Sequence, residues 1–327
     1  MIAQFVIVFY FIVCVGIILF NCFTEISSRY RSRVLKKREQ RYYEEYKPLF
    51  LENITENKKQ EIRLVKELRS TSRLLTFSEA LHKVKNGMPE QFQQGIASVS
   101  RLMEELIPVY QRKSDMEKAC LAYVFAIFHM PKFQTKEIVF PFLFNLLENE
   151  SLYCRENALR ALYSSEDVNV VMKALEFLDA NMQLLPHEKI FADGLLSFNK
   201  KEELIALIWE KLSKFHPGMQ VNLLNYIRYA SPNWKDEMLS LLETNKDLEI
   251  QITCVRYFGR YRDERSVPFL LYHAEEEKEG FWELQNACIS TLAAYPGPQT
   301  LEILKKEISK LSDKGNKDIN DFVVPYY

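Results

Sequence analysis

The sequence predicts an all-α protein built from repeated pairs of helices, and three observations support that prediction. Gly and Pro are scarce, at 9 and 12 of 327 residues, which disfavours turn-dense β architectures and glycine-rich phosphate loops. Apolar residues recur at helical spacing through most of the chain, and no segment alternates as a strand does. Helical segments that end on an aromatic residue recur every 31 to 35 residues. Such a period is typical of repeat proteins, in which each unit buries its apolar face against the next.

The first segment, residues 2–23, is uncharged, and fourteen of its residues between positions 2 and 20 are Ile, Val, Leu or Phe. At ~1.5 Å per residue a helix of this length reaches about 33 Å, enough for the ~30 Å hydrocarbon core of a bilayer. No Lys or Arg precedes Arg29, and no small-residue cleavage site follows, so the pattern does not fit a cleaved signal peptide. We therefore expect residues 1–24 to form a single-pass transmembrane anchor.

Seven basic residues follow the apolar segment, with one acidic residue among them. The positive-inside rule then gives a plasma (inner) membrane protein with its N-terminus outside and its C-terminal domain cytoplasmic. The same side chains are expected to contact lipid headgroups of the bilayer. A nucleic-acid patch is the alternative interpretation, which the position beside the apolar segment disfavours. The expected headgroup contacts are Arg29, Arg31, Arg33, Lys36, Lys37, Arg38 and Arg41.

The rest of the chain divides into three parts. Residues 25–90 are charged and helical in pattern, and we expect them to form a basic juxtamembrane stalk and a capping helix. Asn-Gly-Met-Pro at 86–89 ends that helical pattern. Residues 91–308 hold the repeats, and residues 309–327 form a C-terminal tail.

The aromatic residues that close successive helical segments define the period, with separations of 35, 35, 31, 32 and 34 residues. A second register agrees, because Phe-Pro-Phe-Leu at 140–143 and Val-Pro-Phe-Leu at 267–270 lie 127 residues apart, close to four periods. We expect about five to six helical hairpins, with every period aromatic packed in the core. These aromatics are Phe128, Tyr163, Phe198, Tyr229, Tyr261 and Tyr295.

Residues 254–271, CVRYFGRYRDERSVPFLL, resemble a HEAT repeat: an Arg-bearing helix, an end with a small residue, an Asp turn, and a Val-Pro start to the next helix. Residues 154–162 match the first half of the same pattern, and residues 284–294 match it again. The copies at 186–212 and 218–242 lack the Asp turn, and their assignment depends on spacing alone.

The resemblance to HEAT-repeat (armadillo-type) proteins covers residues 91–308, about two thirds of the chain. It implies a HEAT-type α-solenoid in which the second helix of each unit lines the concave side. With the apolar N-terminus, the layout also resembles bacterial membrane-anchored HEAT-repeat proteins, some of which accompany glycosyltransferases of envelope glycan synthesis. Within one unit we expect Gly259 to allow close helix approach, Asp263 to cap the following helix, and Pro268 to lie in its first turn.

No motif in the chain demands catalysis, and we expect no catalytic residue, no cofactor and no metal. The five histidines lack ligand spacing, and the six cysteines form no CxxC pair, which is typical of reduced thiols. After residue 47 the chain carries 35 Lys or Arg against 40 Asp or Glu, which disfavours nucleic-acid binding. HEAT-like folds include alkylpurine DNA glycosylases and phycobilin lyases, but no chromophore pocket is recognisable and the domain is net acidic.

Three hypotheses of function follow. The first is a membrane-anchored, non-enzymatic scaffold whose cytosolic repeat surface binds an unidentified protein partner. The second is an accessory subunit of a membrane enzyme complex, such as one that makes envelope polysaccharide. The third is a HEAT-fold enzyme of the lyase or DNA glycosylase type. Arginines that directly precede two period tyrosines, with two neighbours, give the candidate protein-binding residues Asn225, Arg228, Arg256 and Arg260.

Overall fold

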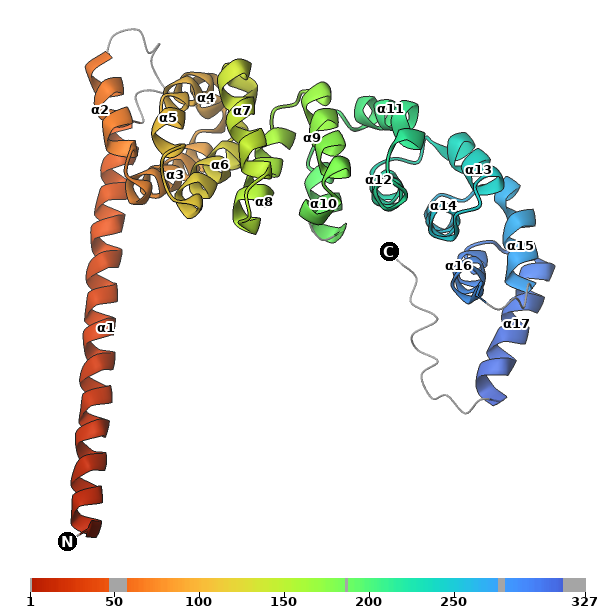
Figure 1. Cartoon of the computed structure of the whole chain (residues 1–327), viewed down its shortest axis with the longest axis horizontal. Coiled ribbons are helices and arrows are strands. Elements are labelled where there is room, and N and C mark those ends of the chain that lie inside the picture. Colours follow the sequence, from red (N-terminus) through yellow and green to blue (C-terminus); the bar gives the residue numbers. More distant parts are fainter. Residues whose placement is uncertain (1, 47–57, 186–187, 276–279, 314–327) are drawn as a thin grey trace. The chain divides into compact units, whose positions relative to one another are not determined.

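The structure is a computed structural model (Figure 1), and its regular elements are helical throughout the described part of the chain, without a strand. The prediction of an all-α protein is therefore confirmed. The chain forms two compact units, residues 1–161 and residues 162–327, which we describe separately. The described ranges are residues 2–46, 58–185, 188–275 and 280–313.

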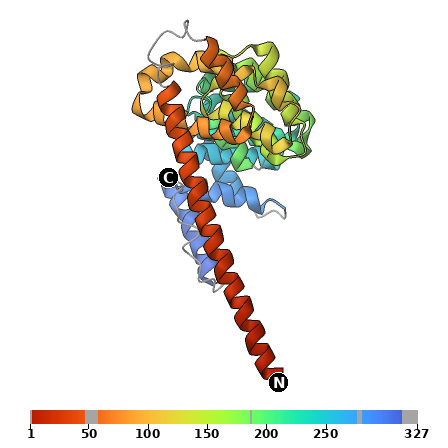
Figure 2. The same ribbon diagram turned by 90° about the vertical axis from the view of Figure 1, so that its left-hand side faces the viewer.

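The first unit is a cluster of helices packed around the 17-residue helix α3 (Thr71–Gly87). Its elements are α1 (Ile2–Tyr46), α2 (Lys58–Leu68), α3 (Thr71–Gly87), α4 (Pro89–Glu104), α5 (Ile107–Tyr110), α6 (Asp115–Ile127), η3 (Met130–Phe133) and α7 (Lys136–Leu147), followed by α8 (Leu152–Tyr163) at the boundary. Helix α3 contacts α1, α2, α4 and α6, and α7 packs on α5 and α6. Helix α1 meets the other helices of this unit near its C-terminal end, and its N-terminal end extends away from them (Figure 2).

The predicted transmembrane anchor is wrong. Within the described residues, no helix has both the length and the apolar character that a membrane crossing needs. The apolar residues start the 45-residue helix α1, which continues without a break into charged sequence. The side chains of residues 2–8 and 10–12, on which the prediction also depended, lie outside the described part.

The predicted localisation is corrected together with the anchor. A single-pass protein of the plasma membrane, with its N-terminus outside, needs a spanning helix, and the described residues contain none. The predicted C-terminal tail, residues 309–327, lies outside the described residues from position 314 onward.

The break predicted at residues 86–89 is confirmed. Helix α3 ends at Gly87 and α4 begins at Pro89. Met88 between them has φ −146° and ψ 67°, because a residue that precedes proline avoids the helical region. Ser78 lies buried inside α3, where its hydroxyl donates to the Leu75 carbonyl oxygen at 2.8 Å.

The second unit is a row of helix pairs. Its elements are α9 (Val168–Ala180), η4 (Met182–Leu184), α10 (Glu188–Leu196), α11 (Lys201–Lys211), η5 (Leu212–Lys214), α12 (Pro217–Ala230), α13 (Lys235–Thr244), α14 (Leu248–Arg260), η6 (Glu264–Ser266), α15 (Val267–Glu275), α16 (Trp282–Leu292) and α17 (Pro298–Asp313). Helices α10, α12, α14 and α16 pack one against the next and form one layer (Figure 1), while α9 contacts α11 and α15 contacts α17. This alternation is compatible with an α-solenoid.

The three expectations within one unit have different outcomes. A Cβ atom added at Gly259 would lie 3.1 Å from the Thr291 hydroxyl oxygen on α16, so the close approach of α14 and α16 is confirmed. Pro268 is the second residue of α15, as expected. Asp263, in contrast, caps the short 3-10 turn η6 rather than α15, because its carboxylate accepts from the Arg265 amide at 3.1 Å.

Most period aromatics are buried, but two are not. The buried ones are Phe128, Tyr163, Phe198 and Tyr295. Tyr229 is 43% exposed and Tyr261 is half-buried, so the expectation of core packing is wrong for these two. They lie at the C-terminal ends of α12 and α14, and the fully buried positions on these helices are taken one turn earlier by Tyr226 and Tyr257.

Candidate protein-interaction surface

The four candidate binding residues lie on two neighbouring helices of the second unit. Asn225 and Arg228 belong to α12, Arg256 and Arg260 belong to α14, and the two helices pack side by side. Arg256 and Arg260 are exposed, whereas Asn225 and Arg228 are half-buried. The structure therefore brings part of the predicted set together, at the C-terminal ends of the two helices.

Two arginines and two tyrosines form a stack that we call the Arg–Tyr ladder: Arg228, Tyr229, Arg260 and Tyr261. The Cζ atom of Arg228 lies 4.5 Å from the centroid of the Tyr229 ring, and its Nη2 donates to the Tyr229 hydroxyl at 2.8 Å. The Cζ atom of Arg260 lies 5.3 Å from the Tyr229 ring and 5.6 Å from the Tyr261 ring. Cation–π contacts at exposed sites contribute ~0.5–1 kcal/mol each. The ladder thus joins α12 to α14 and restrains its guanidinium groups.

Arg256 lies outside the ladder but on the same face of α14 as Arg260, since residues four apart on a helix are neighbours. Among the described residues, neither arginine has a carboxylate oxygen within 4.0 Å of its guanidinium nitrogens. Arg265, only five residues further on, behaves differently: it pairs with Asp236 and Asp263, each at 2.6 Å. The exposed face of α14 therefore presents two positive charges that the described protein does not neutralise.

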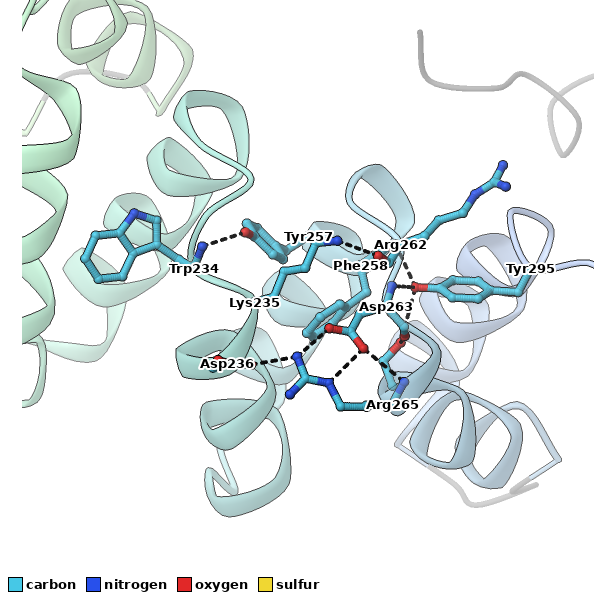
Figure 3. Close-up of polar contacts among 10 residues, drawn as sticks. Trp234, Lys235, Asp236, Tyr257, Phe258, Arg262, Asp263, Arg265 and Tyr295 are labelled. Atoms are coloured by element: carbon cyan, nitrogen blue, oxygen red, sulfur yellow. Dashed lines mark hydrogen bonds and ion pairs between the residues drawn. The ribbon is translucent and has the colours of Figure 1, made fainter.

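Two tyrosine hydroxyls fix the turns that follow α12 and α14 (Figure 3). The Tyr295 hydroxyl accepts from the Asp263 amide and donates to the Phe258 carbonyl oxygen, both at 3.0 Å. The Tyr257 hydroxyl accepts from the Trp234 amide at 3.2 Å. Burial raises the pKa of Tyr257 to about 12, so it stays a neutral phenol at neutral pH. The turns after α12 and α14 are therefore each held by a tyrosine of the next helix pair, Tyr257 and Tyr295.

A charged cluster holds α13 against the turn after α14, as Figure 3 shows. The Arg265 guanidinium donates to both carboxylate oxygens of Asp263, at 2.9 and 2.6 Å, and it also contacts Asp236. The hydrogen bond from Arg265 lowers the pKa of Asp263. Lys235 Nζ donates to the Arg262 carbonyl oxygen at 2.7 Å, while the Arg262 side chain points away from the cluster. These side chains support the turn, and they differ in this respect from the ladder arginines.

The residues expected to contact lipid headgroups lie along α1. The guanidinium of Arg29 pairs with Glu25 at 2.7 Å, and that of Arg41 pairs with Glu67 of α2 at 2.7 Å. Arg38 is half-buried. The side chains of Arg31, Arg33, Lys36 and Lys37 are exposed.

Glu67 connects α1 to α2 in the first unit. Its carboxylate accepts from Arg41 and from the hydroxyl of the fully buried Tyr42, at 2.7 and 2.9 Å. Arg63 of α2 donates to it at 3.3 Å. Burial acts to raise the pKa of Glu67, but the hydrogen bonds from Tyr42 and Arg41 outweigh it and lower that pKa. The carboxylate is thus an internal structural group, which sequence pattern did not indicate because its partners are 25 and 26 residues away.

Within the described residues, no group of three or more His, Cys, Asp or Glu side chains is placed to hold a metal ion. Cys154, Cys254 and Cys288 are buried, whereas Cys22 is exposed. Burial raises the pKa of both Cys254 and Cys288 to about 12, so these thiols are protonated at neutral pH.

No protein-family profile, no curated protein and no solved structure matches this chain. The candidate surface is therefore defined by contacts within this chain. They are the packing of α12 against α14 and the cation–π contacts of the Arg–Tyr ladder.

Proposed function

We propose that this chain is a non-enzymatic protein-binding scaffold, and that the Arg–Tyr ladder with Arg256 is the surface that holds its partner. The single observation that carries the proposal is the stacking of Arg260 beside Tyr229 and Tyr261 on an exposed helix end. Tyr and Arg are the residue types, together with Trp, that contribute most to binding at protein interfaces. Side chains that are already restrained lose less rotamer entropy on binding.

The proposal includes a HEAT-type identity for the helix pairs of the second unit. Three features support it: the successive packing of α10, α12, α14 and α16, the close approach at Gly259, and the Val267–Pro268 start of α15. A scaffold of this kind presents a continuous surface of second helices, because each pair contacts only its neighbours.

Site-specific photo-cross-linking tests the scaffold proposal. A benzophenone amino acid replaces Glu249, which is exposed and lies two turns before Arg256 on the same face of α14. The control position is Tyr272 on α15, which is 66% exposed. We expect a protein adduct from position 249 that is absent at position 272, and that is lost when Arg228 and Arg260 are both replaced by Glu.

The charge-reversed protein must still unfold cooperatively, with a Tm only a few degrees lower, because it loses cation–π contacts of ~0.5–1 kcal/mol each. Adducts that form equally at both positions, or that survive the double reversal, would overturn the assignment of this surface.

A further inference from the structure

The exposed face of α14 carries a pair of positive charges. Arg256 and Arg260 lie one helical turn apart, and among the described residues neither is paired with a carboxylate. Other arginines of the chain, such as Arg41 and Arg265, are neutralised by carboxylates at 2.7 and 2.6 Å. The chain as a whole has a formal net charge of −1, so the pair is a local departure from its average.

Within the described part of the chain, no hydrogen bond uses the guanidinium N–H groups of Arg260. Its guanidinium interacts with the Tyr229 and Tyr261 rings through cation–π contacts at 5.3 and 5.6 Å. A guanidinium carries five N–H donors in a fixed planar fork, and stacking on rings uses its face rather than those donors. Carboxylates match that fork with two parallel hydrogen bonds. The group best suited to this face is therefore a carboxylate.

The spacing of the two arginines sets the spacing of the ligand. Residues four apart on a helix have Cβ atoms about 5–6 Å apart. In an extended peptide, residues two apart point to the same side and lie roughly 6.6 Å apart. An acidic residue, any residue, and a second acidic residue would thus present two carboxylates at the separation of Arg256 and Arg260. The exposed ring of Tyr229 offers apolar contact area beside them.

We propose that the α14 face binds an extended acidic segment of a partner protein, with two carboxylates that engage Arg256 and Arg260. This inference deepens the scaffold function proposed above and rests on it. It names the recognised chemistry: an acidic-x-acidic sequence, held by paired guanidiniums and bordered by tyrosine rings.

A selection from random twelve-residue peptides displayed on mRNA, with the full chain as bait, tests the inference. We expect enrichment of peptides with two acidic residues separated by one residue, and loss of that enrichment with the Arg256→Glu and Arg260→Glu double variant. Lys246→Glu is the matched control, since it changes the charge of an exposed residue in the same unit without touching this face. The Lys246→Glu bait should return the same peptides as the wild-type chain.

Binding constants for a selected peptide complete the test. Replacing its two Glu by Gln should raise Kd roughly tenfold or more, which corresponds to about 1.4 kcal/mol per factor of ten. Arg256→Lys with Arg260→Lys should retain part of the affinity, because the charge remains and the fork is lost. A cooperative thermal melt of each variant, lowered by no more than the loss of the Arg260 cation–π contacts, shows that the fold is intact.

The outcomes separate the two proposals. Selected peptides without paired acidic residues, or an equal Kd for the Gln peptide, would overturn the acidic-segment inference. If the adduct from position 249 forms while no acidic peptide is selected, the inference falls and the scaffold function stands. If neither is observed, both fall. Much tighter binding of a synthetic peptide with phosphoserine in place of both Glu residues would overturn the carboxylate assignment.

Discussion

Replacing Tyr295 by Phe removes one hydroxyl group and keeps the ring that fills the core. Tyr295 is only 2% exposed, and its hydroxyl contacts three groups in and directly after α14. It accepts from the Asp263 amide, donates to the Phe258 carbonyl oxygen, and lies 3.2 Å from the Ser266 hydroxyl. The change is therefore a test of whether the tyrosine hydroxyls, rather than apolar packing alone, hold successive helix pairs together.

The magnitude follows from what the substitution leaves behind. Each intramolecular hydrogen bond contributes a net ~1 kcal/mol, and a buried donor or acceptor left without a partner costs about 1–3 kcal/mol. We expect the variant to lose about 2–3 kcal/mol of unfolding free energy. For a domain of 150–250 residues, a loss of ~2 kcal/mol lowers Tm by roughly 4–8 °C.

The assay is thermal and urea unfolding of the full chain, with Tyr272→Phe as control. Tyr272 is 66% exposed, so removal of its hydroxyl should leave Tm within about 1 °C. Hydrogen exchange supplies a local readout, because the Asp263 amide should exchange faster in the Tyr295 variant only. Equal effects of the two substitutions, or no effect of the first, would refute the role assigned to the Tyr295 hydroxyl.

Three further predictions concern other parts of the chain. The lowered pKa of Glu67 means that its stabilisation is complete above the ordinary Glu pKa of ~4.3 and is lost as pH falls through the lowered value. Glu67→Gln should thus lower the unfolding free energy by roughly 1–3 kcal/mol at pH 7. In urea titrations it should also reduce the loss of unfolding free energy as the pH falls below the ordinary Glu pKa, and an unchanged loss would contradict this. Asp247→Ala should cost ~1 kcal/mol because it removes the cap of α14, and Asp247→Ser should restore most of it in the same assay. Iodoacetamide at pH 8 should label Cys22 of the native protein and spare Cys254 and Cys288, as mass spectrometry can show.

The helix-pair organisation could be predicted from the sequence because it depends on local rules. The preference of proline for the first turn of a helix, and of aspartate for the position before a turn, depends only on neighbouring residues. The predicted start of α15 at Val267–Pro268 is confirmed. The matching Phe-Pro sequence misled in one respect. Pro141 lies inside α7, in its second turn, and not at a helix start as Pro268 does. The shared Pro-Phe-Leu sequence therefore occupies different helix positions in α7 and α15.

Spacing located the arginines of the candidate surface but not the exposure of their tyrosines. Arg228 and Arg260 are 32 residues apart, one period, so their placement on adjacent helices follows from the repeat. The exposure of Tyr229 is a property of packing rather than of sequence pattern. Because one helix turn earlier Tyr226 already fills the core, the later ring is left for the surface.

The apolar start of the chain gave the largest error. Hydropathy treats residues 2–23 as a separate element, whereas the structure continues them into one helix that ends at Tyr46. Its C-terminal end is held to α2 through Glu67, and that contact is long-range in sequence. Hydropathy over a short segment carries no information on such contacts. Neither the end of α1 at Tyr46 nor the ion pair of Arg41 with Glu67 could therefore be predicted from it.

A charge swap between the two sides of the interface tests the central claim most directly. The Kd of a selected acidic peptide and of its Lys-x-Lys counterpart would be measured against the wild-type chain and against the Arg256→Glu and Arg260→Glu variant. If the guanidiniums of α14 read paired carboxylates, the wild-type chain prefers the acidic peptide and the variant prefers the Lys-x-Lys peptide. If both proteins rank the two peptides in the same order, the α14 face is not the acidic-segment site.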